Sequence, residues 1–404
     1  MNRRILSVGA AALVLPAALA GCVANDDGAS SGTDAAGSGD PIAVEIDETT
    51  CDVAVSEATS GQVKFTLNNK GPAKNEFEVL AEDKLRIVGE LENLGPGTTR
   101  DFTVLLESGT YYTACKKNMV GSLVDAREFT VTGDAVELAA DDKAAIDEGV
   151  KQYEAYIRDQ SGQLLEATKN FAESYKAGDD EAARAQYAPA RMFYERIEPT
   201  AEAFGDIDPA LDEREADYQE ADDTADREWT GWHVIEKDLW QPKPEDNDGK
   251  AYQPFSPADR AKYADKLVAD TQELYDLVYA DDFEVNIDDI SNGAISLLEE
   301  VATTKITGEE EFFSHTDLWD FQANLEGAEV AFGNVEALAK KKDPELTEQI
   351  NQRIGDLKDE LAKYKEGDGY VYYDTLNDQQ TRELADKVDA LRVPLAKLTE
   401  AILS

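Results

Sequence analysis

The two histidines of this 404-residue chain mark the positions where metal chemistry is most easily recognised. His233 lies three residues before Glu236 in GWHVIEK, and this spacing places both side chains on one face of a helix. Glu195 and Glu198 have the same spacing in YERIEP, and Asp212 lies between the two pairs in PALDEREADY. Facing helices that carry such pairs build the carboxylate-rich metal centres of helical bundles. The pattern predicts a site for iron, zinc or manganese, because carboxylates and one imidazole suit these ions.

Each pair also has a simpler interpretation. In a chain with 85 acidic residues, Glu-x-x-Glu arises often by chance, and a histidine beside Trp232 also fits an aromatic cluster. The second histidine, His315 in SHTDLWDF, is expected near the start of a helix in a core-supporting role. The His-Glu-x-x-His motif of zinc proteases is absent, because no histidine follows His233 at the required spacing.

Cys51 and Cys115 lie in the first third of the chain and leave two alternatives open. A pair of cysteines in an exported protein most often forms a disulfide. The other interpretation is a metal site made of Cys51, Cys115 and an acid such as Glu76, with Met119 close to Cys115. A blue-copper centre is excluded, because it requires two histidines and residues 41–132 contain none.

The charge and the N-terminus indicate an exported, membrane-tethered protein. The formal net charge of −46 repels nucleic acid, which is therefore not an expected partner. Residues 1–21 have the basic start and apolar stretch of a signal peptide, and LAGC at residues 19–22 resembles a lipobox. We expect cleavage before Cys22, lipidation of Cys22, and anchoring at the outer face of the cytoplasmic membrane. Residues 22–40 are rich in Gly, Ser, Ala and Asp and are expected to form a flexible tether.

The remaining chain divides into a β domain and an α domain. Residues 41–132 contain about seven short segments with alternating apolar and polar residues, such as GQVKFTLNN, which predict an antiparallel sandwich. Residues 137–404 have helical spacing, with helices expected at 257–280, 291–306, 315–341, 344–366 and 377–403 among others. An all-α domain of this length exceeds one four-helix bundle, so we expect two packed bundles.

Three long motifs in order carry a family resemblance. YAPARMFYERIEPTAEAFGDIDPALDEREADY, WTGWHVIEKDLW and KITGEEEFFSHTDLWDFQANLEGA resemble the imelysin-like domain of EfeO-type iron-uptake proteins. CDV, NEFEVL and GTYYTACKKNMVG resemble the cupredoxin-like domain that precedes it in that family. The resemblance implies metal ligands at His233 and Glu236 and companion acids at Glu195, Glu198, Asp212 and Glu309. In the β domain it implies a site at Cys51, Glu76 and Cys115, with Met119 or Glu78 as further candidates.

The same resemblance implies a function in iron uptake. The expected protein is an extracytoplasmic component that binds Fe³⁺ or Fe²⁺ as cargo and works with an iron permease and a haem peroxidase. Copper or zinc is an alternative occupant of the β-domain site. We expect no enzymatic activity. A hydrolytic metal site needs an open coordination position and a general base, whereas the many acids here are expected to bind the metal. An imelysin-like metallopeptidase and a disulfide-stapled surface adhesion lipoprotein are the alternatives, and the latter predicts no metal dependence.

Overall fold

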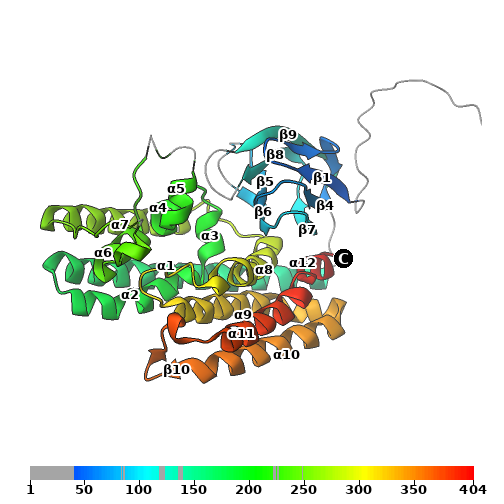
Figure 1. Ribbon diagram of the computed structural model, residues 1–404. Helices are drawn as coiled ribbons and strands as arrows, with labels where there is room; N and C mark the ends of the chain where they lie inside the picture. Colours follow the sequence, from blue (N-terminus) through cyan, green and yellow to red (C-terminus); the bar gives the residue numbers. More distant parts are fainter. Residues whose placement is uncertain are drawn as a thin grey trace, which may run out of the picture. The chain divides into compact units, whose positions relative to one another are not determined.

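The computed structural model describes residues 41–404 except 83, 85, 86, 118–122, 135–139, 222, 223, 225, 226 and 248. The expected signal peptide, the expected lipidation at Cys22 and the expected tether lie outside the described residues, as does Met119. The described chain begins with nine strands and continues with helices (Figure 1). This order confirms the predicted β-then-α class.

The β domain is a sandwich of two sheets. One sheet has the order β2-β1-β4-β7 and the other the order β3-β9-β8-β5-β6. The strands are β1 (Ile42–Ile46), β2 (Cys51–Val53), β3 (Glu57–Thr59), β4 (Gly61–Asn69), β5 (Asn75–Leu80), β6 (Ile87–Leu94), β7 (Thr99–Leu106), β8 (Gly109–Lys117) and β9 (Val124–Thr132). Most pairings are antiparallel, but β1 pairs with β4 and β3 with β9 in parallel.

Aromatic side chains fill the space between the two sheets. Phe65 on β4 lies 5.0 Å from Phe77 on β5 and 5.7 Å from Phe129 on β9, measured between ring centroids. Residues of β4 alternate between buried and half-buried, as expected for a strand with one face in a core. Burial of such rings is the main driving force for this domain.

The α domain contains twelve helices among its described residues. They are α1 (Ala140–Ala177), α2 (Asp180–Glu195), α3 (Glu198–Glu202), α4 (Ile207–Asp212), α5 (Glu215–Glu220), α6 (Trp232–Trp240), α7 (Pro257–Val278), α8 (Ile287–Thr303), α9 (Asp317–Lys342), α10 (Pro344–Leu361), α11 (Asp378–Leu395) and α12 (Leu398–Leu403). Short 3₁₀ turns are η1 (Pro244–Asp246), η2 (Lys305–Thr307), η3 (Ala362–Tyr364) and η4 (Tyr373–Thr375). Strands β10 (Lys365–Glu366) and β11 (Gly369–Tyr370) form a small hairpin.

The long helices form two groups that share α9. Helices α8, α9, α10 and α11 pack in a ring, while α1 packs against α2, α7 and α9 (Figure 1). The buried apolar side chains of both groups belong to one continuous core, which runs from Tyr153 to Ile402. The two expected bundles are thus present as two helix groups that share α9 and pack around one core. Because α9 lies between the two groups, its buried face can carry polar side chains that reach a site inside the domain.

Two side chains of helix α8 form hydrogen bonds with the backbone of an edge strand of the sandwich. Strand β7 is an edge strand, so part of its backbone has no strand partner. The carboxylate of Asp288 accepts a hydrogen bond from the Leu105 N–H at 2.6 Å, and the amide of Asn292 donates to the Thr103 carbonyl at 3.0 Å. Asp288 and Asn292 are four residues apart and thus lie on one helix face. These contacts join the sandwich to the helices.

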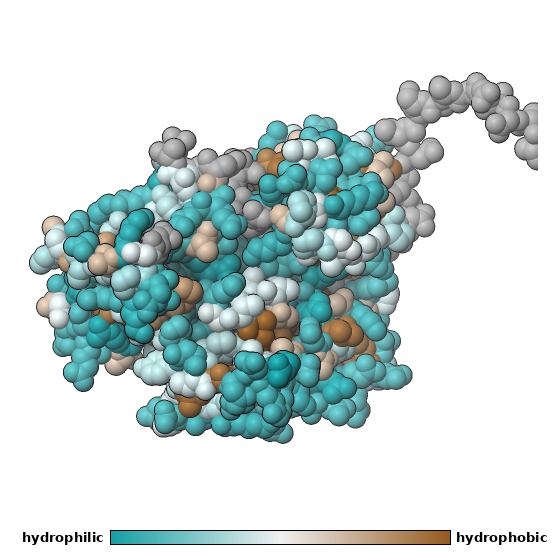
Figure 2. All heavy atoms as spheres, viewed as in Figure 1, coloured by the Kyte–Doolittle hydropathy of each residue, from teal (hydrophilic) through white to brown (hydrophobic). Residues whose placement is uncertain are grey.

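The outer surface is strongly hydrophilic. The face drawn in Figure 2 is mostly polar, with a few separate apolar patches. This distribution agrees with the excess of acidic over basic residues. Among the described residues, no helix has both the length and the apolar character needed to cross a bilayer.

Candidate metal centre

Helix α6 carries His233, and a glycine sets its starting position. Gly231 precedes the helix with φ 91° and ψ −161°, a backbone conformation that is essentially limited to glycine. A Cβ atom at this position would collide with the carbonyl oxygen of Leu211. The absence of a side chain lets α6 begin against the end of α4, where Asp212 follows Leu211.

Trp232 anchors the same turn. It is fully buried, and its ring lies 5.1 Å from that of Phe171 and 5.8 Å from that of Tyr187. The aromatic cluster of the simpler interpretation therefore exists, but Trp232 belongs to it and His233 does not. His233 is next in the chain and points to acidic residues instead, with only 1% of its surface exposed.

Glu236 holds one side of the His233 ring. Nδ1 of His233 lies 3.2 Å from Oε2 of Glu236, one helical turn further on. The other carboxylate oxygen of Glu236 accepts hydrogen bonds from the backbone N–H groups of Phe313, at 2.9 Å, and Ser314, at 2.6 Å. Both oxygens of Glu236 are thus engaged, and the carboxylate fixes the orientation of the ring. This is how carboxylates commonly support a metal-binding histidine.

The other ring nitrogen is buried and makes no hydrogen bond to any residue that the structure describes. Nε2 of His233 lies 3.4 Å from Oδ1 of Asp212 and 3.7 Å from Oε1 of Glu310. The three ligand atoms lie within 4.8 Å of one another. Ligand atoms that share one first-row metal ion at about 2.1 Å are roughly 3–4 Å apart. We call His233, Asp212 and Glu310 the His233 site.

Two buried cations neutralise the acids behind this site. The guanidinium of Arg191, on α2, contacts Asp212, lies 2.5 Å from Glu195 Oε1 and lies 2.6 Å from Glu311 Oε1. The ammonium of Lys305, in η2, lies 2.5 Å from Glu195 Oε2 and 3.0 Å from Glu198 Oε2. Buried carboxylates are stable only when paired in this way.

The local charges keep two carboxylates of the His233 site ionised. Burial alone raises the pKa of Asp212, but Arg191 and His233 outweigh it and lower that pKa. Burial also opposes ionisation of Glu310, yet Lys305 and His233 hold its pKa well below the usual value.

His233 gains from the same arrangement. Burial and the nearby Arg191 lower the pKa of His233. Asp212, Glu236 and Glu310 outweigh these effects, so the pKa lies well above the ordinary value. A metal ion at Nε2 would therefore take the place of a proton between two carboxylates.

The structure brings most of the predicted residues together, although in different roles. Glu195 ends α2 and Glu198 begins α3, so the pair lies on two helices instead of one. Both acids contact Lys305. Glu309 is exposed and belongs to none of the metal-capable groups of the described residues. Its neighbour Glu310 is buried in the site instead.

Sequence reasoning missed Arg191 and Lys305, and among the acids Glu309 to Glu311 of GEEE it chose Glu309 instead of Glu310. GEEE offers three consecutive acids, and spacing alone does not show which of them a turn directs inward. Arg191 precedes Glu195 by four residues, which is the spacing of a helical ion pair and the available signal. His315 is half-buried just before α9, and its carbonyl accepts the Tyr373 N–H at 2.9 Å. It is outside the metal-capable groups, and its role in this turn fits the structural role expected for it.

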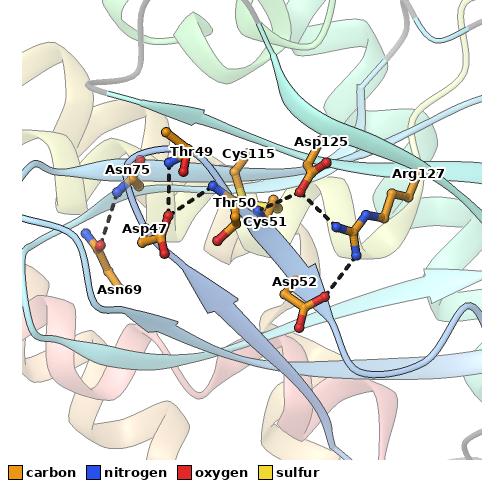
Figure 3. The surroundings of a disulfide bond; sticks show 10 residues. All are labelled: Asp47, Thr49, Thr50, Cys51, Asp52, Asn69, Asn75, Cys115, Asp125 and Arg127. Atoms are coloured by element: carbon orange, nitrogen blue, oxygen red, sulfur yellow. Dashed lines mark hydrogen bonds and ion pairs between the residues drawn. A yellow bond between two sulfur atoms is a disulfide. The ribbon is translucent and has the colours of Figure 1, made fainter.

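In the β domain, the expected cysteine-containing metal site is wrong for this structure. Cys51 and Cys115 form a disulfide, with Cα atoms 5.6 Å apart, and Asp125 accepts the Cys51 N–H (Figure 3). Neither sulfur is available as a thiolate for copper or zinc. Strand alternation also separates Glu76 from the cysteines, because Cys115 pairs with Phe77 on the core face.

Glu76 instead lies with other acids on the outer face of its sheet. Glu76, Glu78 and Glu90 form one acidic group, and the ammonium of Lys116 lies 2.9 Å from Glu78 and 3.6 Å from Glu76. Burial raises the pKa of Glu78 to about 8, with Glu76 adding to the effect and Lys116 opposing it.

A cavity of about 780 Å³ adjoins both acidic regions. The α domain lines it with Asp212, Glu198 and Glu310, and the sandwich lines it with Glu78 and Lys116, among other residues. The cavity thus reaches two of the three residues of the His233 site. A cation in it meets carboxylates on both walls.

The chain matches known families over most of its length. Residues 149–398 match the family described as imelysin, Peptidase M75, and residues 11–124 match the cupredoxin-like domain. The chain is 36% identical over 361 residues to the iron uptake system component EfeO of Escherichia coli O6:H1 strain CFT073. It is 35% identical, again over 361 residues, to proteins of the same name from Escherichia coli K12 and Shigella flexneri. Each match covers 88% of this chain and 90% of the relative.

Proposed function

Because the chain belongs to the imelysin family and is a relative of the EfeO iron uptake components, we propose that it captures iron at the His233 site and delivers it to a permease. One observation carries this proposal: Nε2 of His233 is buried, faces Asp212 and Glu310, and has no hydrogen-bond partner in the described part of the chain. A buried polar atom of this kind needs an explanation, and an ion bound between Nε2 and the two carboxylates would supply one. One imidazole with two carboxylates suits Fe²⁺ or Fe³⁺ as cargo.

The location proposed for this activity is the outer face of the cytoplasmic membrane. Lipid at Cys22 would keep the binder beside its permease, and the tether of residues 22–40 would give it reach. A haem peroxidase is the second proposed partner, as in the uptake system that the family resemblance implies. Cys22→Ala tests the anchor: we expect this variant in the culture medium and the unaltered protein in the membrane fraction. Equal release of both proteins would reject lipid anchoring.

Peptidase activity has less support, although the imelysin family carries a peptidase name. A metallopeptidase needs a carboxylate that is free to act as a general base beside the metal. Glu236 is the nearest candidate, and the His233 ring and two backbone N–H groups engage its carboxylate. Incubating the iron-loaded protein with an unfolded polypeptide tests this alternative. Metal-dependent cleavage that is lost in Glu236→Gln would establish it.

Iron binding by matched variants tests the proposal itself. Fe²⁺ is titrated anaerobically into the full chain and into His233→Ala, Asp212→Asn and Glu310→Gln. We expect each of these variants to lose affinity by at least about 10-fold, because each lacks a ligand atom. His315→Ala and Glu309→Gln change the same residue types outside the site and should bind as the unaltered chain does. Equal affinity of all five variants would rule out the His233 site.

A further inference from the structure

Lys305 is buried among carboxylates in a way that resembles a bound metal ion. None of its surface is exposed. Its ammonium lies 2.5 Å from Glu195 Oε2, 3.0 Å from Glu198 Oε2 and 3.5 Å from Glu300 Oε2. Three carboxylates from α2, α3 and α8 thus converge on one positive charge. We call these residues the Lys305 pocket.

A further side chain holds the carboxylates of the Lys305 pocket in place. Nδ2 of Asn324, on α9, donates to Glu195 Oε2 at 3.1 Å and to Glu198 Oε2 at 3.2 Å. These are the same oxygens that approach the ammonium most closely. The oxygens therefore remain directed at the Lys305 position.

The Lys305 pocket is adjacent to the His233 site. Carboxylate oxygens of Glu195, Glu198 and Asp212 lie within 4.8 Å of one another, and Asp212 also belongs to the His233 site. Two cation positions that share or adjoin a carboxylate are the arrangement of two-metal centres in helical bundles. In this chain one of the two positions is filled by an amino group.

We propose that Lys305 is an internal cation that fills the second position of a two-metal centre and thereby limits the α domain to one iron ion. The inference rests on the proposed function, because it takes the His233 site as the first position. Lys305 is covalently part of the chain, so incoming ions cannot remove it by mass action. A single ion held by three side chains is also easier to pass on than an ion bridged to a second one.

The physical argument rests on charge balance. Without the ammonium, Glu195, Glu198 and Glu300 would face one another at close range, and Arg191 forms an ion pair with Glu195 alone of the three among the described residues. Leaving buried charges uncompensated is strongly unfavourable, and a divalent cation would restore the balance. Removal of Lys305 should therefore create a metal site and not merely an empty space.

The test counts metal ions bound to the full chain. Mn²⁺ is used as the probe, with metal analysis after equilibrium dialysis and electron paramagnetic resonance of the bound ion. Lys305→Met should bind one Mn²⁺ more than the unaltered chain, and its spectrum should show coupling between two neighbouring ions. Lys305→Arg keeps the charge and should retain the original count. Lys143→Met is the matched control, because Lys143 pairs with Asp147 at the surface, where both side chains are exposed.

The outcomes separate this inference from the proposed function. A folded Lys305→Met that binds no extra ion overturns the inference, whereas an unaltered chain that binds no metal in the α domain overturns the proposed function. Lys305→Met that folds only when Mn²⁺ is present supports the inference.

If Lys305→Met does not fold under any condition, Mn²⁺ binding by Glu198→Gln tests the inference instead. Glu198 belongs to the Lys305 pocket and not to the His233 site, so we expect this variant to bind its one ion with nearly unchanged affinity. A loss of about 10-fold or more, as for a lost ligand, overturns the inference.

Discussion

The two nitrogens of the His233 ring have different partners, and this difference assigns roles to the residues around them. Nδ1 lies against Glu236, whereas Nε2 faces Asp212 and Glu310 and makes no hydrogen bond within the described residues. We therefore propose that Glu236 supports the ring and is not itself an iron ligand. The sequence spacing predicted that His233 and Glu236 lie close together. The spacing did not show whether Glu236 is a metal ligand or a supporting residue, because a residue one helical turn from His233 could have either role.

Glu236→Gln tests this division of roles. The amide has nearly the same shape but carries no charge, so the ring loses its strongest orienting partner. We expect iron affinity to fall by about 10–100-fold, the usual cost of losing such a supporting carboxylate. Anaerobic Fe²⁺ titration measures the change. Glu309→Gln, which removes the charge of an exposed glutamate, is the control. Unchanged affinity would show that Glu236 has no role in metal binding.

At the scale of elements, the site depends on how closely short helices approach one another. Asp212 ends α4, His233 lies in the first turn of α6, and Glu310 lies in the turn before α9. Sequence patterns predicted the strands and the long helices, because those have clear periodicity. They did not predict which acid of the GEEE turn faces inward, since a turn has no repeating pattern that fixes side-chain direction.

Gly231→Ala tests the contact between α4 and α6. A methyl group would collide with the Leu211 carbonyl, and the backbone conformation of Gly231 is unfavourable for any other residue. We expect the free energy of unfolding to fall by about 1–3 kcal/mol, with weaker iron binding because Asp212 moves relative to His233. Urea unfolding and Fe²⁺ titration measure both effects. Gly333→Ala, at an exposed position inside α9, should leave iron binding unchanged and should not lower the free energy of unfolding, because alanine favours a helix more than glycine does. A Gly231→Ala protein as stable as the unaltered chain would contradict the account.

Asp288→Asn tests the contact between α8 and β7 through its pH dependence. Burial raises the pKa of Asp288 to about 8, with Asp289 adding to the effect and the Leu105 N–H opposing it. Between the ordinary aspartate pKa and this value, the folded protein keeps a proton that the unfolded chain releases. Stability from this group is therefore complete at acid pH and is lost as the pH rises towards about 8.

We accordingly expect a difference in slope between variants. From about pH 5 to about pH 8, the free energy of unfolding should fall more steeply for the unaltered chain than for Asp288→Asn, which does not titrate. Urea unfolding at several pH values measures both slopes. Asp281→Asn, at an exposed position, should behave as the unaltered chain does. Parallel slopes for Asp288→Asn and the unaltered chain would show that Asp288 titrates normally.

At the scale of the whole molecule, the α domain carries the proposed iron site and the β domain carries a disulfide. The sequence left the state of Cys51 and Cys115 open, because spacing does not show which face of a strand a side chain occupies. Strand pairing places Cys115 in the core of the sandwich and Glu76 on the opposite face. The disulfide links residues 64 positions apart in the chain. Its expected role is stability and not metal binding.

The double variant Cys51→Ala/Cys115→Ala tests that role. Removing a disulfide that closes a long loop should lower the free energy of unfolding of the β domain by about 2–4 kcal/mol. Iron binding at the His233 site should be unchanged, because both sulfurs lie in the core of the sandwich. Denaturant unfolding and Fe²⁺ titration report the two quantities separately. Loss of iron binding in a variant that remains folded would assign the cysteines a role in the site.

The position of bound iron tests the central claim most directly. Crystals of the full chain loaded with iron, measured at the iron absorption edge, show each iron ion as an anomalous peak. We predict one such peak in the α domain, about 2 Å from His233 Nε2 and from carboxylate oxygens of Asp212 and Glu310. Iron bound only at Glu76, Glu78 and Glu90, or a peak away from His233, would contradict the account.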